Sequence, residues 1–282
     1  MSSVAEALKR GAARLSAAGI ESARLDARVL MAHVLGMPSN EVALSRRQLT
    51  PEQQGAFEAL VERRAGHEPV AYLTGEKEFY GLTFDVGPGA LVPRPESETL
   101  IEEACREFPD RDAALTVLDL GTGTGCLLLS FLMAYPKARG LGIDSSAEAL
   151  DWAARNVRCH GLEAHSEVAR CDWQELPPRQ YDVVLANPPY VATSDLEAAQ
   201  GQSLAFEPRA ALDGGPDGLD AYRGLAPLLP RLLSPAGRAF LEIGRGQGPS
   251  IVKIFEPEGL SMLRIADDLA GIPRCLVVRR QG

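Results

Sequence analysis

The sequence lacks the features that would place it in a membrane or in a secretory pathway. None of its apolar runs reaches the roughly 18 residues that a membrane-spanning helix needs, and the longest, Cys126–Tyr135, is predicted to be a buried helix. The amino-terminal MSSVAEALKRG has no apolar stretch behind its basic residues, so we do not expect it to act as a signal peptide. We therefore do not expect this protein to be a membrane protein or a secreted one.

The cysteines and histidines are too scattered to form a disulfide framework or a metal site. The five cysteines are odd in number and include no Cys-x-x-Cys pair, which argues for reduced thiols and against disulfides or zinc. The four histidines do not cluster in the sequence as metal ligands do. We therefore predict a cytoplasmic protein that holds no metal.

The sequence also lacks the excess of positive charge that is typical of nucleic-acid-binding proteins. Its net charge is −9. Residues 1–72 contain nine basic and eight acidic side chains and the remainder contains twenty and thirty, so the two parts carry +1 and −10. An acidic body repels a phosphate backbone, and we do not expect direct binding to nucleic acid.

Residues 1–72 have the signals of a small helical domain. An apolar stripe follows a capping serine at Ser3, and a second helical segment is expected over 22–35. A third helix is predicted to begin at Thr50, where a cap precedes a proline and a glutamine, and to end near Gly66. We interpret this region as a helical bundle whose task cannot be read from periodicity.

Residues 73–95 change in character and are predicted to form a β-hairpin linker. Strand-like residues occur over 79–86 and again at Leu91 and Val92, with Gly87-Pro88-Gly89 expected as the turn between them. A helix is predicted to begin within 96–99.

Residues 96–282 alternate between strand and helix patterns. This alternation predicts an α/β domain built on a mostly parallel sheet, which binds its ligand beyond the carboxyl ends of the strands. The expected strands are 115–120, 141–143, 183–186, 239–243 and 275–278, and the clearest helices are 147–157 and 219–233.

A glycine loop follows the first of these strands. It reads Gly121-Thr122-Gly123-Thr124-Gly125, and glycines there allow a tight turn and a close approach of the backbone to a ligand. A dinucleotide fingerprint needs Gly-x-Gly-x-x-Gly, but Cys126 occupies the position of its last glycine. The Gly-x-Gly-x-Gly spacing after an acidic residue instead resembles motif I of class I methyltransferases.

Two further acidic residues stand at predicted strand ends. Asp144 lies about 20 residues beyond the glycine loop, where a carboxylate accepts hydrogen bonds from both ribose hydroxyls of a nucleoside. Asp172 and Trp173 follow the next strand, and we expect them to contact the base of the same ligand.

The tetrapeptide Asn187-Pro188-Pro189-Tyr190 decides the predicted chemistry. Two prolines fix the backbone and leave carbonyls projecting rigidly. A planar –NH₂ group donates two protons, which the side-chain oxygen of Asn187 and the carbonyl of Pro188 can accept. Tyr190 offers a flat face for stacking. We therefore predict methyl transfer to an amide-type nitrogen, without a general base, because the methylated nitrogen sheds its proton afterwards.

Together these motifs make the sequence resemble the HemK/PrmC family of release factor glutamine methyltransferases. The resemblance covers the chain from about residue 69 onward, and Ser97 stands where the family often has Thr or Asp. Its other matching stretches are 69–75, 78–81, 92–98, 207–212, 217–223 and 242–244.

The resemblance implies a helical domain, a hairpin and a Rossmann-like seven-stranded class I methyltransferase domain. It implies that S-adenosyl-L-methionine is bound by the glycine loop, Asp144, Trp173 and Asn187, and is converted to S-adenosyl-L-homocysteine. It also implies that Asn187–Tyr190 holds the glutamine of the Gly-Gly-Gln loop of class I peptide-chain release factors. The helical domain would then recognise a remote part of that protein substrate.

Two alternatives are open at this point, and two others are disfavoured by the sequence. The same core motifs would serve a glutamine methyltransferase acting on a ribosomal protein, and adenine or guanine amino groups present a similar planar nitrogen. A binding module that has lost its activity predicts an eroded glycine loop or a replaced Asn187, and both are intact. A nicotinamide dehydrogenase does not fit the glycine spacing.

Overall fold

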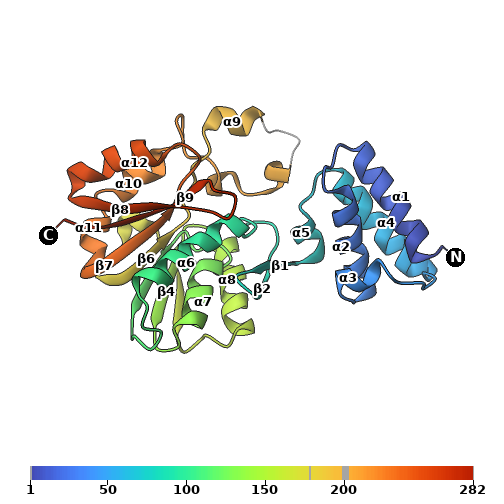
Figure 1. Cartoon of the computed structure of the whole chain (residues 1–282), viewed down its shortest axis with the longest axis horizontal. Helices are drawn as coiled ribbons and strands as arrows, with labels where there is room; N and C mark the ends of the chain where they lie inside the picture. Colours follow the sequence, from blue (N-terminus) through green and yellow to red (C-terminus); the bar gives the residue numbers. More distant parts are fainter. Residues whose placement is uncertain (1, 178, 199–202, 282) are drawn as a thin grey trace. The chain divides into compact units, whose positions relative to one another are not determined.

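The computed structural model describes residues 2–177, 179–198 and 203–281. The chain forms two compact units (Figure 1). One comprises Met1–Glu76 with Gly201–Phe206, and the other comprises Lys77–Gln200 with Glu207–Gly282. Among the described residues, no helix is long and apolar enough to cross a membrane.

The first unit is helical, and its local signals act as predicted. Ser3 caps the first helix in a reciprocal arrangement with Glu6, and Gly36 ends the second in a left-handed conformation with φ 60°. Apolar side chains from the helices share one buried core, whose largest member is Phe57. The helices are α1 (Val4–Ala17), α2 (Ala23–Leu35), α3 (Ser39–Val42), α4 (Pro51–Ala65) and α5 (Val70–Thr74).

The cap of α4 provides a test of local helix stabilisation. The Thr50 hydroxyl accepts a hydrogen bond from the Gln53 amide at 3.2 Å, and the Gln53 side chain accepts one from the Thr50 amide at 3.1 Å. Replacing Thr50 with Ala should lower the free energy of unfolding by about 1 kcal/mol, as followed by urea denaturation of the helical signal. Thr50→Ser keeps the acceptor and should stay near wild type. Equal losses in the two variants would contradict the capping role.

The hairpin is present, but the predicted position of its turn is wrong. It consists of β1 (Glu76–Phe79) and β2 (Leu82–Asp85), and the turn lies at Tyr80 and Gly81, with φ of 51° and 75°. Two consecutive positive φ values match the twist of a two-residue hairpin. The Tyr80 amide is held by the Glu98 carboxylate at 3.0 Å.

Gly87 and Gly89 serve packing instead of a hairpin turn, and Leu91–Val92 is not a strand. A Cβ atom on Gly87 would lie 2.3 Å from the Trp152 ring, and one on Gly89 would lie 2.7 Å from the Glu148 side chain. Both partners belong to helix α8 (Ala147–Cys159), so these glycines let the chain run close along that helix.

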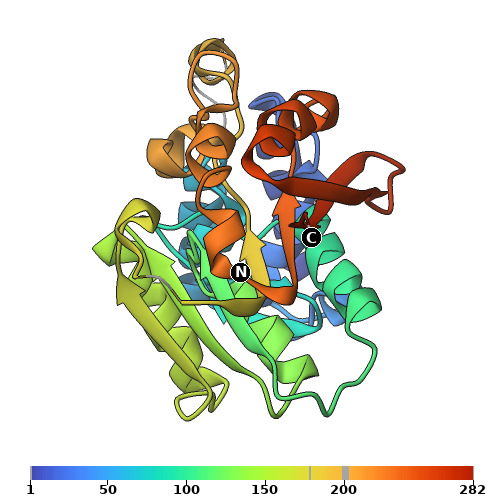
Figure 2. The same ribbon diagram turned by 90° about the vertical axis from the view of Figure 1, so that its left-hand side faces the viewer.

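The second unit contains a seven-stranded sheet in the order β5-β4-β3-β6-β7-β9-β8. All neighbours are parallel except β9, which runs antiparallel to both β7 and β8. Figures 1 and 2 show the β8–β9 pair (red) beside β7 (orange). The strands are β3 (Thr116–Leu120), β4 (Arg139–Asp144), β5 (Ser166–Arg170), β6 (Tyr181–Ala186), β7 (Leu233–Glu242), β8 (Leu260–Asp267) and β9 (Pro273–Arg280).

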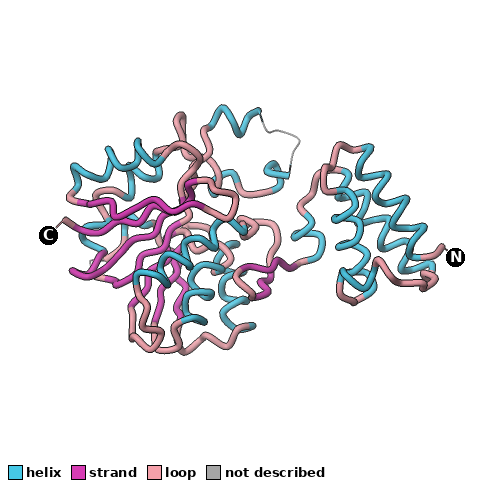
Figure 3. The backbone as a smooth tube through the Cα atoms, viewed as in Figure 1, coloured by secondary structure: helices cyan, strands magenta, loops and turns pink. Residues whose placement is uncertain are grey.

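Helices flank this sheet, which confirms the predicted α/β architecture (Figure 3). The predicted helix 219–233 is wrong, because it is broken near Pro227 into two short helices and Leu233 already belongs to β7. The helices that surround the sheet are α6 (Glu98–Glu107), α7 (Cys126–Ala134), α8, α9 (Thr193–Ala198), α10 (Asp220–Leu225), α11 (Leu229–Leu232) and α12 (Gly248–Phe255).

The register of the three central strands positions the motifs. Leu120 at the end of β3 pairs with Ile143 of β4 on one side and with Ala186 of β6 on the other. The glycine loop, Asp144 and Asn187 each follow these residues directly. The sheet therefore delivers all three predicted motifs to one edge.

Candidate active site

The glycine loop is a tight, hydrogen-bonded turn between β3 and α7. The amides of Gly121 and Thr122 both donate to the carbonyl of Ile143, at 2.9 and 2.8 Å. Gly121, Gly123 and Gly125 have φ of 73°, 57° and 82°, a region that glycine adopts without a steric penalty. A Cβ atom on Gly121 or Gly123 would meet nothing within 4 Å. The loop backbone therefore faces open space, as a ligand cradle requires.

A buried carboxyl group lies beneath this loop. Asp119 is fully buried at the centre of the sheet, and its Oδ2 accepts a hydrogen bond from the Thr122 hydroxyl at 2.7 Å. Its Oδ1 has no hydrogen-bond partner among the described residues. Burial raises the pKa of Asp119 to about 7. The hydrogen bond from Thr122 joins this buried carboxyl group to the glycine loop and helps to fix the loop's conformation.

The structure brings Asp144, Asp172 and Trp173 to the wall of the same cavity. Asp144 Oδ2 accepts a hydrogen bond from the Gly123 amide at 2.9 Å, so this carboxylate also fixes the loop. Asp172 is exposed and accepts a hydrogen bond from the Gln174 amide at 2.9 Å. Trp173 is half-buried against the apolar core. The two carboxylates remain available to a ligand, because each has about four acceptor positions. Trp173 presents the part of its ring that the core does not cover.

The cavity measures ≈ 280 Å³ and extends from the glycine loop to the Asn-Pro-Pro-Tyr segment. Asn187, Pro188 and Pro189 line it together with Gly121–Thr124. Gly125 and Tyr190 do not line it. Gly125 instead caps helix α7. The two strongest sequence motifs therefore share one cavity, as predicted, while two of their residues lie behind its wall.

Tyr190 belongs to a chain of polar side chains that the sequence motifs do not include. Its hydroxyl donates to Glu242 Oε1 at 2.9 Å, and the Ser97 hydroxyl donates to the other oxygen, Oε2. Asn187 Nδ2 donates in turn to Ser97 Oγ at 3.2 Å. Burial raises the pKa of Tyr190, and the neighbouring Glu242 raises it further, so its hydroxyl stays protonated.

A loop of residues 212–220 holds the end of the motif. Backbone hydrogen bonds join Val191 to this loop on both sides, at 3.0 and 2.8 Å. The Gln247 side-chain amide donates to the carbonyls of Tyr190 and Gly218, at 2.9 and 3.3 Å. A Cβ atom on Gly218 would lie 2.4 Å from the Tyr190 carbonyl, so only glycine permits this approach. The backbone of Tyr190 is therefore fixed from two directions.

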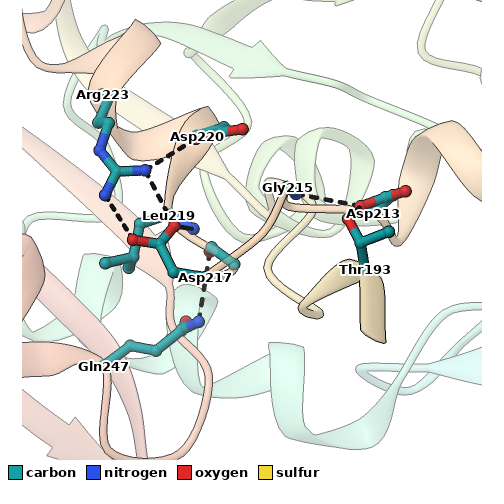
Figure 4. Close-up of polar contacts among 9 residues, drawn as sticks. Thr193, Asp213, Gly215, Asp217, Leu219, Asp220, Arg223 and Gln247 are labelled. Carbon is teal, nitrogen blue, oxygen red and sulfur yellow. Dashed lines mark hydrogen bonds and ion pairs between the residues drawn. The ribbon is translucent and has the colours of Figure 1, made fainter. Parts of the chain in front are cut away.

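The carboxylates of the same loop are occupied by internal partners (Figure 4). Asp213 accepts a hydrogen bond from the Thr193 hydroxyl at 2.7 Å. Arg223 pairs with Asp217 and with Asp220. These contacts within the loop stabilise its conformation.

Cys126 and Arg94 also lie in the cavity wall. Burial raises the pKa of the Cys126 thiol to about 12, so it is not a nucleophile near neutral pH. Arg94 supplies positive charge at the wall and pairs with the buried carboxylate of Glu207. Glu207 also accepts a hydrogen bond from the Val92 amide at 3.0 Å.

Sequence reasoning assigned no site role to Ser97, Glu242 or Gln247. Ser97 and Glu242 stand in stretches that carry the family resemblance, but no motif connects them to Asn187. One signal was available for Glu242, since it is an acidic residue that closes the apolar run 239–241 in a sheet strand. A buried acid at that place requires a polar partner.

Comparison with known proteins gives matches to both units of the chain. The PrmC N-terminal domain matches residues 6–75, and the methyltransferase small domain matches residues 97–217. A release factor glutamine methyltransferase of Rhodospirillum rubrum is 42% identical over 97% of this chain and 84% of the relative. One from Cereibacter sphaeroides is 40% identical over 98% of both chains.

Solved structures agree on the fold. A methyltransferase from Pyrococcus furiosus superposes with a TM-score of 0.52 at 16% identity, and the match covers 72% of this chain and 90% of the other. The seven-stranded sheet with its antiparallel last strands is thus the class I methyltransferase fold implied by the family resemblance.

Proposed function

Since this chain belongs to the release factor glutamine methyltransferases, we propose that it methylates the glutamine side chain of the Gly-Gly-Gln loop in class I peptide-chain release factors. The methyl donor is S-adenosyl-L-methionine, and the reaction takes place in the cytoplasm, where release factors act. The cavity shared by the glycine loop and the Asn-Pro-Pro-Tyr segment is the observation that carries this proposal.

The cofactor half of the cavity has the donor set of a nucleoside site. We assign the ribose hydroxyls to Asp144, the base to Asp172 and Trp173, and the remainder of the molecule to the glycine loop and Asn187. The open space over Gly121 and Gly123 and the position of Asp144, Asp172 and Trp173 on the wall of the same cavity support this fit. When bound, S-adenosyl-L-methionine supplies an electrophilic methyl group on a positively charged sulfur.

The other half of the cavity accepts the amide. Asn187 Nδ2 is committed to Ser97, which leaves Oδ1 to accept one proton of the target –NH₂. The Pro188 carbonyl accepts the second proton, and the two prolines prevent this carbonyl from turning away. Two fixed acceptors orient the nitrogen and stabilise the positive charge that develops on it during methyl transfer.

Removal of the proton needs no dedicated base. A methylated amide nitrogen that carries positive charge is strongly acidic, so it releases its proton to solvent after the methyl group has been transferred. Cys126 and Tyr190 are unsuited to take it, because the pKa of each is raised and both stay protonated. The acceptor oxygens therefore contribute to catalysis by orienting the target nitrogen and stabilising its developing charge, and not by removing a proton.

The decisive test is methylation of an unmodified release factor. The protein would be incubated with labelled S-adenosyl-L-methionine and release factor, and the label located by peptide mass spectrometry. We expect the gain of one labelled methyl group on the peptide that contains Gly-Gly-Gln. A gain on a ribosomal protein or on RNA, without one on the release factor, would replace the proposed substrate.

Deletion of residues 1–72 tests the proposed recognition role of the helical domain. Binding energy from a remote part of a substrate raises kcat/KM at the reacting centre. We therefore expect kcat/KM on the intact release factor to fall at least about 10-fold, with an unchanged rate on a short Gly-Gly-Gln peptide. Calorimetric binding of S-adenosyl-L-methionine is the control for folding. Full activity on the intact protein would remove this role.

A further inference from the structure

Glu242 is a buried carboxylate that forms no ion pair. It ends β7, its exposed fraction is 1%, and none of the salt bridges among the described residues includes it. Its two oxygens are satisfied by the hydroxyls of Ser97 and Tyr190. Burying an unpaired charge lowers the stability of a fold, and a neutral glutamine of the same shape would lower it less. Burial raises the pKa of Glu242, whereas the hydrogen bonds from Ser97 and Tyr190 and the nearby charge of Arg274 favour its ionised form. In that form the carboxylate can only accept hydrogen bonds, and this property is not needed for packing.

The charge sets the direction of the hydrogen bonds that lead to Asn187. A carboxylate only accepts, so Ser97 must donate its single hydroxyl proton to Glu242. The Ser97 oxygen can then only accept, and the group that reaches it from Asn187 must be the –NH₂ end of the amide. The direction of the Ser97–Glu242 hydrogen bond thus determines the direction of the Asn187–Ser97 hydrogen bond.

We propose that Glu242 is a positioning residue which, through Ser97, determines which end of the Asn187 amide faces the substrate. This inference rests on the proposed function, since it concerns the acceptor of the target nitrogen. With Oδ1 toward the cavity, Asn187 accepts a proton from the substrate amide. With the amide reversed, two –NH₂ groups would face each other and neither could accept.

The same carboxylate also fixes the far end of the tetrapeptide. Tyr190 donates to Glu242 Oε1, and its backbone carbonyl is held by Gln247. The Tyr222 hydroxyl donates to the Glu242 carbonyl oxygen at 2.7 Å, which fixes the backbone that carries the carboxylate. One residue thus anchors both Asn187 and Tyr190 of the motif.

Glu242→Gln is the direct test, because it keeps the shape and removes the directionality. A glutamine can donate to Ser97, and Ser97 can then donate to Asn187 Oδ1 and reverse the amide. We expect kcat to fall about 30-fold, with the dissociation constant of S-adenosyl-L-methionine and the melting temperature near wild type. Ser97→Ala should give a similar loss, Ser97→Thr should restore most of the rate, and the double variant Glu242→Gln/Ser97→Ala should lose little more than either single one.

Glu103→Gln is the matched control. Glu103 is a carboxylate of the same unit with an exposed fraction of 2%, but it pairs with Arg106 and Arg264 and does not line the cavity. This variant should be less stable than wild type while kcat is unchanged. Wild-type kcat in Glu242→Gln, or a loss of kcat in Glu103→Gln of the same size as in Glu242→Gln, would overturn the inference.

A spectroscopic readout separates this inference from the proposed substrate. The chain has three asparagines, Asn40, Asn156 and Asn187, so selective ¹⁵N labelling yields three side-chain amide signals. The Asn187 signal should move in Glu242→Gln and in Ser97→Ala, and the other two should stay in place. An unmoved Asn187 signal would refute the positioning role even in an active enzyme. A moved signal with no methylation of release factor by wild type would leave the positioning intact and refute the substrate.

Discussion

Replacing Asn187 with Ala should reduce methyl transfer to the release factor by roughly 10²- to 10³-fold, the loss typical for one preorganised polar contact to a developing charge. The variant lacks one of the two acceptors that orient the target nitrogen. Its fold should persist, because Asn187 is only partly buried and its side chain makes one hydrogen bond within the described part of the chain, to Ser97. Single-turnover kinetics with mass-spectrometric detection measures the chemical step.

Asn187→Asp separates the acceptor from the rest of the side chain. It keeps the volume and an oxygen toward the cavity, but it cannot donate to Ser97 and brings a second carboxyl group near Glu242. We expect an activity between those of the alanine variant and wild type. Turnover of the alanine variant within about threefold of wild type would refute the amide-acceptor mechanism, whatever the aspartate variant does.

Replacing Asp144 with Ala should weaken binding of S-adenosyl-L-methionine about 100-fold, since two hydrogen bonds to a charged group are lost together. The structure adds a second reason. Asp144 also holds the amides of Gly123 and Ser146, each at 2.9 Å, so the glycine loop loses an internal support. Isothermal titration calorimetry gives the dissociation constant directly.

Asp144→Asn removes the charge and one acceptor but keeps the other. The asparagine oxygen can accept the amide of Ser146 or that of Gly123 but not both, and its –NH₂ group cannot accept from a ribose hydroxyl. We therefore expect most of the affinity loss to remain in Asp144→Asn, with a smaller change in melting temperature than in the alanine variant. An unchanged dissociation constant in both variants would remove Asp144 from the cofactor site.

The features that the sequence predicted correctly depend on short-range signals. The cap at Thr50 and the left-handed end at Gly36 are decided within a few residues, and the structure confirms both. The alternation of strands and helices likewise predicted that the glycine loop, Asp144 and Asn187 share one sheet edge, because parallel strands direct their carboxyl ends to the same side. The roles of the glycine loop, Asp144 and Asn187 in binding and catalysis are predictions, which the experiments described above would test.

The features that were missed depend on long-range contacts or on rare backbone conformations. Ser97 and Glu242 are 145 residues apart, and no periodicity connects them. The hairpin turn was misplaced because a tyrosine with positive φ is uncommon, whereas Gly-Pro-Gly is a strong turn signal. Those glycines are explained only by the approach of Trp152 and Glu148, which is a property of the tertiary structure.

The position of β9 between β7 and β8 has a consequence for the order of folding. The ribosome makes β9 after both of its neighbours, so a nascent chain cannot complete this side of the sheet until Pro273–Arg280 has emerged. Glu242 pairs in register with Cys275, and its strand therefore has an open edge until then. Insertion of a strand between two that precede it raises the contact order and slows folding. The carboxylate that organises the site is thus among the last residues to acquire its native surroundings during synthesis.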